Sequence, residues 1–157
     1  MLYETEGLYY IGNFINGSRQ GLGFMVNADG SYYQGEWYQN LPHGYGEYYS
    51  PDRTWTFKGK WKAGLKDGVG EETFPDGTIF KGLYKEGVKE GEGLLIFTTE
   101  CQFDDRNIDQ GASTLKATMP AAGRAKMRCN FRGFFKADVA CGPGIQKGEN
   151  YKYDGNW

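Results

Sequence analysis

The chain has 157 residues, enough for one domain with a buried core, and its net charge of −2 at pH 7 argues against a general affinity for nucleic acid. Glycine accounts for 25 residues and aromatic residues for 17% of the chain, while hydrophobic residues make up only 39%. Because glycine costs about 1 kcal/mol per helix position relative to alanine, this composition argues against a helical protein and favours strands joined by tight turns.

The N-terminal stretch MLYETEGLYYIGNF has neither a basic start nor a long apolar run, and it indicates no signal peptide. No apolar run in the sequence approaches the roughly 20 residues needed to cross a bilayer. Cys101, Cys129 and Cys141 are odd in number and include no C-x-x-C pair. We therefore expect a cytoplasmic protein with reduced thiols.

A motif of fixed positions recurs from residue 9 onward. Each copy has an aromatic-x-Gly-x-aromatic segment, followed seven positions later by Gly-x-Gly. The first glycines of four consecutive copies are Gly12, Gly35, Gly59 and Gly82, which gives steps of 23, 24 and 23 residues. The five copies are YIGNFINGSRQGLG, YQGEWYQNLPHGYG, FKGKWKAGLKDGVG, FKGLYKEGVKEGEG and, starting at Phe131, FRGFFKADVACGPG. This regularity predicts a repeat protein.

The alternation within each copy predicts a β-hairpin. In FKGKW, the residues Phe57, Gly59 and Trp61 fall on one face of a strand and the two lysines fall on the other. DGVGEETF follows as the returning strand, and Asp-Gly or similar pairs close the hairpins. A lone hairpin is marginal in water, so the units must stack side by side. We expect a ring from the adjacent unit to lie across the backbone that each glycine leaves bare.

This pattern resembles the MORN repeat, whose motif is about Y-x-G-x-W-x-x-G-x-x-x-G-x-G followed by D-G. The fullest match consists of Phe57, Gly59, Trp61, Gly64, Gly68, Gly70, Asp76 and Gly77. The predicted fold is all-β, a single elongated, twisted antiparallel sheet of stacked hairpins that forms an open, solenoid-like ribbon. Asn40 and Asp138 replace the glycine in the middle of the motif, and both tolerate the left-handed conformation. Pro51-Asp52-Arg53 replaces an Asp-Gly turn with one residue inserted.

Three segments follow from the repeat pattern. Residues 1–97 are predicted to hold a continuous array of four repeats, beginning at about residue 9. Residues 98–130 lack the glycines, and we interpret them as a degenerate repeat with a basic insertion loop, in which a short helix could form. Residues 131–157 carry the fifth repeat and the first strand of a sixth, with Gly155 as its glycine. The absent returning strand favours a cut from a longer array over a partner that covers this edge.

Motifs of catalysis are absent from the sequence. His43 is the only histidine, so neither a histidine-based triad nor a multi-histidine metal site can form. The Gly-x-Gly pairs recur at the repeat period and lack the G-x-x-x-x-G-K-[ST] pattern of a nucleotide-binding loop. The sequence therefore predicts a protein that is not an enzyme and that needs no cofactor or metal.

The leading functional hypothesis is a scaffold or adaptor that binds a protein partner along an aromatic groove. A strongly twisted sheet forms a groove, and rings dominate binding hot spots, so a helix or an extended segment could lie there. The predicted protein-binding residues are Tyr33, Trp37, Phe57, Trp61, Phe80, Tyr84, Phe131 and Phe135. The alternative for each ring is that packing between repeats consumes it. The resemblance to MORN proteins further implies a cytoskeletal setting, such as a ciliary axoneme.

The distribution of charge supports a second hypothesis. Residues 1–110 carry 17 acids and 10 bases, whereas residues 111–157 carry 3 acids and 8 bases. The basic cluster is made of Lys116, Arg124, Lys126, Arg128, Arg132 and Lys136. It could bind anionic phospholipids, as proposed for MORN arrays, or an acidic protein partner, or it could be a solvated face. A third hypothesis is that the chain is the accessory region of a larger enzyme, as MORN arrays accompany lipid kinases and a lysine methyltransferase.

Overall fold

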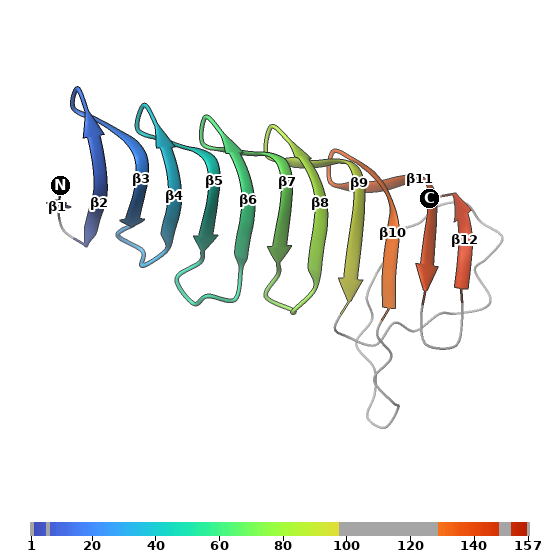
Figure 1. Cartoon of the computed structure of the whole chain (residues 1–157). Helices are drawn as coiled ribbons and strands as arrows, with labels where there is room; N and C mark the ends of the chain where they lie inside the picture. The colour runs from blue at the N-terminus through green and yellow to red at the C-terminus, as the bar shows by residue number, and fades with distance from the viewer. Residues whose placement is uncertain (1, 6, 98–128, 148–151, 157) are drawn as a thin grey trace.

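The computed structural model describes residues 2–5, 7–97, 129–147 and 152–156. In these ranges every regular element is a strand, and 12 strands form one antiparallel sheet in which each strand pairs with its neighbours in sequence. The strands are β1 (Leu2–Thr5), β2 (Leu8–Ile15), β3 (Ser18–Val26), β4 (Tyr32–Tyr38), β5 (Leu41–Tyr49), β6 (Thr56–Lys62), β7 (Leu65–Thr73), β8 (Ile79–Lys85), β9 (Val88–Phe97), β10 (Cys129–Lys136), β11 (Val139–Lys147) and β12 (Lys152–Asn156). Figure 1 shows them in a row from β1 to β12. The predicted open ribbon of hairpins is confirmed.

Each repeat is a hairpin closed by a two-residue turn in which both residues have positive φ. The five turns are Asn16-Gly17, Gln39-Asn40, Ala63-Gly64, Glu86-Gly87 and Ala137-Asp138. Positive φ at both central residues is the geometry of the type I′ turn, which matches the twist of the flanking strands. Asn40 and Asp138 each have φ of 68°, so the left-handed conformation predicted for both is confirmed.

These two turn residues also tie neighbouring repeats together. The N–H of Asn40 donates to the carbonyl of Arg19 at 3.2 Å, and its side-chain Oδ1 accepts from the N–H of Arg19 at 2.9 Å. Asp138 makes the same two contacts to Lys89, at 3.1 and 2.9 Å. Glycine at this place could provide only the backbone bond, so the departures from the motif add a contact between repeats.

Glycines form one continuous row across the sheet, each paired with the next in the strand register. The row consists of Gly12, Gly23, Gly35, Gly46, Gly59, Gly70, Gly82, Gly93, Gly133, Gly144 and Gly155. The inserted residue at Pro51-Asp52-Arg53 leaves it in register. There Asp52 Oδ1 accepts from Ser50 Oγ at 2.7 Å and from the N–H of Thr54 at 3.1 Å.

The ribbon passes directly from the fourth hairpin to the fifth. Gly93 on β9 pairs with Gly133 on β10, so no strand lies between them in the sheet. Cys129 and Asn130, the last two residues of the segment predicted as a degenerate repeat, belong to β10 and pair with Phe97 and Ile96 of β9. Residues 98–128, including the short helix considered there, lie outside the described residues. The predicted first strand of a sixth unit is present as β12, where Gly155 pairs with Gly144.

The first aromatic residue of each repeat lies across the two glycines of its own hairpin. A Cβ atom on Gly70 would lie 2.5 Å from ring carbons of Phe57, and one on Gly59 would lie 2.9 Å from the same ring. The prediction that a ring of the adjacent unit covers the glycines is therefore corrected. Phe57 is two residues before Gly59 on the same face of the strand, and its ring extends along that strand over the bare backbone. The ring of Tyr84, from the next repeat, lies farther away, at 3.4 Å from a Cβ atom on Gly70.

The second aromatic residue of each repeat connects neighbouring repeats. Trp37 meets Tyr33 of its own repeat and Tyr10 of the preceding repeat edge-to-face, with ring centroids 5.1 and 5.3 Å apart. Such contacts continue without a break along the ribbon through Phe14, Tyr10, Trp37, Tyr33, Trp61, Phe57, Tyr84, Phe80, Phe135 and Phe131. This zigzag of rings on one face of the sheet, the ring face, is the core.

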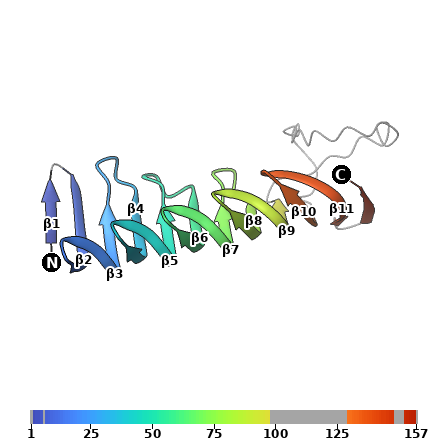
Figure 2. The same ribbon diagram turned by 90° about the horizontal axis from the view of Figure 1, so that it is seen from above.

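A bulge after the row glycine of the first strand interrupts the register in each of the five repeat hairpins. The register shifts between Gly35 and Glu36 in the second repeat, for example, and on the returning strand Gly44 adopts a φ of +61°. Bulges of this kind increase the local bend and twist of a strand. Seen from above in Figure 2, the returning strands from β3 to β11 form a series of similar arches.

Replacing a row glycine by alanine should destabilise the ribbon. In Gly93→Ala the new Cβ would lie 2.5 Å from the Phe80 ring and 3.1 Å from Phe135, so we expect a loss of about 2 kcal/mol in the free energy of unfolding. Gly17→Asn is the control, because a Cβ there meets nothing within 4 Å and asparagine tolerates its φ of +77°. Urea unfolding measures the free energy of unfolding of both variants and of the parent chain. Equal stability of Gly93→Ala and the parent chain would contradict this packing.

Candidate functional site

The structure places seven of the eight predicted binding rings in the core. Tyr33, Trp37, Phe57, Phe80, Tyr84, Phe131 and Phe135 are buried, with Phe57 and Phe80 at 0% exposure. The hypothesis that they form a free binding surface is thereby corrected in favour of the alternative, because the single-layered sheet has no second layer and its rings must cover the glycines and one another. Trp61 is half-buried, which leaves part of its ring accessible.

An open hollow of about 530 Å³ lies on the ring face over the first three repeats. Its lining runs along the ribbon from Arg19 on β3 to Lys66 on β7 and includes the turn glycine Gly87. Between these ends the lining is mostly apolar, and it contains Met25, Trp37, Tyr48, Trp55, Trp61 and Leu65. Partly accessible apolar side chains therefore line this hollow.

Arg19 lies in the hollow against rings. Its guanidinium carbon is 4.5 Å from the centroid of Trp37 and 5.6 Å from that of Tyr10. Nη2 donates to the carbonyl of Asn40 at 3.0 Å, and Nη1 donates to the sulfur of Met25. Burial lowers the pKa of Arg19, and the Tyr10 hydroxyl opposes this shift. Among the residues that the structure describes, no carboxylate pairs with Arg19.

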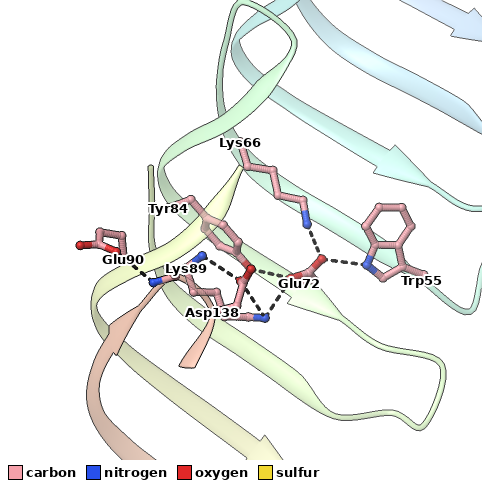
Figure 3. A network of polar contacts seen from close by, with 8 residues as sticks. Trp55, Lys66, Glu72, Tyr84, Lys89, Glu90 and Asp138 are labelled. Carbon is pink, nitrogen blue, oxygen red and sulfur yellow. Dashed lines mark hydrogen bonds and ion pairs between the residues drawn. The ribbon is translucent and has the colours of Figure 1, made fainter. Parts of the chain in front are cut away.

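A network of charged groups fills the neighbouring part of the ring face (Figure 3). Glu72, buried on β7, pairs with Lys66 and, at 3.8 Å, with Lys89. Its carboxylate also accepts hydrogen bonds from the hydroxyl of Tyr84 at 2.7 Å and the indole N–H of Trp55 at 2.8 Å. Three hydrogen-bond donors and a second lysine charge therefore surround one carboxylate.

The network extends from the third repeat to the fifth. Lys89 Nζ lies 3.6 Å from Asp138 Oδ1, and the N–H of Ala137 donates to Glu90 Oε2 at 3.1 Å. Each lysine also lies over rings, with Lys66 Nζ 4.8 Å from the centroid of Phe57. The cations on this part of the face are thus paired with anions from the chain itself.

The two partners of the central ion pair respond differently to their surroundings. Burial by itself would raise the pKa of Glu72, but the donors around it and the positive charge of Lys66 outweigh burial, so the pKa of this carboxyl lies below its ordinary value. Burial lowers the pKa of Lys66, and Glu72 only partly opposes it. This difference is reasonable because Glu72 has several donors to itself, whereas Lys66 shares its one carboxylate with Lys89.

The predicted basic cluster is only partly described. Arg132 and Lys136 are exposed on β10, on the face opposite to Phe131 and Phe135. The other four members, Lys116, Arg124, Lys126 and Arg128, lie outside the described residues. Arg132 lies in the register row of Lys81 and Leu94 on the outer face, away from the hollow.

A metal site would need several ligating side chains in one place. Residues 2–5, 7–97, 129–147 and 152–156 contain no group of three or more His, Cys, Asp and Glu side chains that could hold a metal ion. In the same part of the chain no helix is long and apolar enough to cross a membrane. His43 is exposed beside the turn of the second hairpin, where the N–H of Ala63 donates to its Nδ1 at 3.5 Å.

Comparison with known families matches the MORN repeat at residues 10–32, 33–55, 57–79 and 80–102, which together cover more than half of the chain. The chain belongs to the MORN repeat family. A search of curated proteins finds no match. The hairpin of β10 and β11 lies beyond the matched segments, yet it continues the glycine row and the ring zigzag of the four MORN repeats.

Two signals for this site are present in the sequence, and the predictions from the repeat motif missed both. Arg19, Lys66 and Lys89 occupy the same place in three of the MORN repeats, two residues before the bulge glycine of the returning strand. Glu72 is paired with Phe57 and Phe80 in the strand register, so it is a charged residue in a row of rings. A charge at such a place predicts a buried partner of opposite sign.

Removing the charge of Glu72 should destabilise the MORN array in a pH-dependent way. Because the folded-state pKa of Glu72 is depressed, its contribution is fully present above the unfolded value of about 4.3 and is lost as the pH falls through the folded value. Glu72→Gln should therefore cost about 3 kcal/mol at pH 7, and the difference from the parent should narrow below about pH 4.

Urea unfolding at neutral and acidic pH measures this difference. Glu71→Gln is the matched control: Glu71 pairs with Lys81 at 2.8 Å on the outer face, both side chains are more than 40% exposed, and the expected loss is less than about 1 kcal/mol. A loss for Glu72→Gln that stays constant across the pH range would contradict the assigned role of its charge.

Proposed function

We propose that this MORN-repeat chain is a non-catalytic scaffold that holds an extended segment of a protein partner in the hollow of its ring face. The observation that carries the proposal is the hollow itself, an open depression of about 530 Å³ in which apolar side chains remain accessible. Aromatic residues that are partly accessible in a depression are the typical anchors of protein interfaces.

The shape of the hollow favours an elongated occupant. Its lining extends across four strand spacings from β3 to β7, which corresponds to about 19 Å. Pockets for small ligands enclose most of the ligand's surface, whereas this hollow is open along the ribbon. A peptide segment can follow such a depression and continue beyond it in both directions.

The setting of this scaffold is part of the same proposal. The family resemblance implies a cytoskeletal or axonemal partner in the cytoplasm, and imaging of the tagged chain in cells that express it tests that setting. Phospholipid binding through the basic cluster has weaker support, since Arg132 and Lys136 alone are described and both face away from the hollow. The third hypothesis, an accessory region of a larger enzyme, is decided by the full reading frame.

A charge introduced into the hollow should abolish partner binding without unfolding the chain. Leu65 lines the hollow and is 50% exposed, so Leu65→Arg should be tolerated by the fold while it blocks an apolar segment. Val69→Arg is the matched control: Val69 is on the same strand and 63% exposed, but it pairs with Leu83 on the outer face and does not line the hollow.

The measurement is affinity purification of each tagged variant from cells that express the protein, followed by quantitative mass spectrometry. We expect specific partners to be depleted at least about tenfold from Leu65→Arg, since loss of an interface anchor costs more than 1 kcal/mol, and to be retained by Val69→Arg. Circular dichroism confirms that both variants are folded. Retention of the same partners by Leu65→Arg would place the binding site elsewhere.

A further inference from the structure

Two cations occupy equivalent places on the ring face, one in the first repeat and one in the third. Arg19 and Lys66 each precede the bulge glycine of their returning strand by two residues. Each lies over the first ring of its own repeat and the second ring of the next: Arg19 over Tyr10 and Trp37, and Lys66 over the corresponding Phe57 and Tyr84. The site around Arg19 in the first repeat therefore has the same arrangement of a cation over two rings as the site around Lys66 in the third repeat.

The two sites differ in their anion. In the third repeat the carboxylate of Glu72, two residues after Gly70, pairs with Lys66. In the first repeat the equivalent place, two residues after Gly23, is occupied by Met25. A thioether is a weak acceptor and carries no charge, and the other acceptor for Arg19 is a backbone carbonyl. Within the part of the chain that the structure describes, the first site is thus a cation that lies over two rings and has no carboxylate partner, unlike Lys66 in the third repeat.

This incomplete site opens onto the hollow. Arg19, Met25 and Trp37 all line it, so an occupant of the hollow can reach the guanidinium. At the other end of the hollow Lys66 is already neutralised by Glu72. The charge of the hollow is therefore positive at its β3 end and balanced at its β7 end.

We propose that the partner segment held in the hollow carries an aspartate or glutamate whose carboxylate pairs with Arg19, as Glu72 pairs with Lys66 within the chain. This inference rests on the proposed function, a protein segment in the hollow, and names its chemistry. The geometry also sets the composition around the acid. The accessible parts of Tyr48, Trp55 and Trp61 lie along the hollow towards β7, so the residues on that side of the acid are apolar.

The length of the recognised segment follows from the hollow. About 19 Å corresponds to roughly six residues of extended chain at about 3.3 Å per residue. One acid is required rather than two, because a second carboxylate near Lys66 would meet Glu72 and its charge. The expected motif is one acidic residue at the end of a short apolar run.

The test begins with a display library of random peptides, longer than the expected segment, selected on the full chain. Peptides whose binding is lost on Leu65→Arg and kept on Val69→Arg are those in the hollow. The best of these is synthesised together with a second form in which its acid is replaced by the amide. We expect the enriched peptides to carry Asp or Glu beside apolar residues, and the amide form to bind about tenfold more weakly or worse.

Three variants then locate the carboxylate. Arg19→Gln removes the cation, and Met25→Glu supplies the anion from within the chain, as Glu72 does in the third repeat. Both should weaken the acidic peptide about tenfold or more while affecting the amide form little. Met25→Gln has the same length as glutamate without its charge, and it should leave the acidic peptide within about twofold of the parent. Thermal unfolding confirms that each variant is folded.

The outcomes separate this inference from the proposed function. A hollow-binding peptide that tolerates Arg19→Gln and Met25→Glu overturns the role of Arg19 but leaves the scaffold intact. Failure to select any peptide that depends on Leu65 overturns the proposed function and this inference with it. Sedimentation with phosphatidylserine vesicles that is lost on Arg19→Gln, in the absence of peptide binding, assigns the site to a phospholipid headgroup and also overturns the inference.

Discussion

An aromatic ring laid across two facing glycines is the contact on which this protein is built. In the third repeat Phe57 covers Gly59 and Gly70, which face each other across a hairpin, and no side chain larger than hydrogen fits beneath the ring. The contact buries a ring without a second layer of structure, which a single sheet otherwise needs. It also fixes the register, because a shift of one residue between the two strands would put Val69 or Glu71 under the ring in place of Gly70.

The same contact decides which residues remain for function. The two rings of each repeat pack against one another in the core. The side chains that can differ between repeats are therefore those at the margins of the ring face. In each repeat, one such position lies two residues after the row glycine of the returning strand. It is occupied in successive repeats by Met25, Tyr48, Glu72 and Leu95. In the third repeat this position is Glu72, and a network of charged groups covers the ring face there. In the first two repeats it is Met25 and Tyr48, and the ring face there forms the hollow. Variation at one place of the repeat thus gives one sheet two different surfaces.

Much of the fold was predictable because glycines and aromatic residues recur at fixed positions of the repeat. The spacing of Gly12, Gly35, Gly59 and Gly82 fixed the period, and the alternation around each fixed the strand faces. Alternation tells which residues share a face, but it does not tell whether a ring on that face covers its own hairpin or the next. Nor does it distinguish a ring that packs in the core from one that is open to a partner, and seven of the eight predicted binding rings are core.

The candidate site was less predictable because it depends on contacts between repeats. Nothing local marks Lys89 as a partner of Asp138, which is 49 residues away, and their contact exists because β9 and β10 are neighbours in the sheet. The sequence does hold two signals: Glu72 is a carboxylate in a row of rings, and a cation recurs two residues before the bulge glycine in three repeats. The sequence did not predict that β9 and β10 are neighbours, because residues 98–130 interrupt the regular spacing of the repeats between these two strands.

The most direct test of the central contact is a double-mutant cycle between Phe57 and Gly70, measured by urea unfolding. Gly70→Ala should cost about 2 kcal/mol in the parent chain, because its Cβ would lie 2.5 Å from the Phe57 ring. In a Phe57→Leu background the ring atoms that clash are gone, so the same substitution should cost less than half as much, with a coupling energy of about 1 kcal/mol or more. Costs that simply add would show that the ring does not rest on this glycine, and would contradict the account.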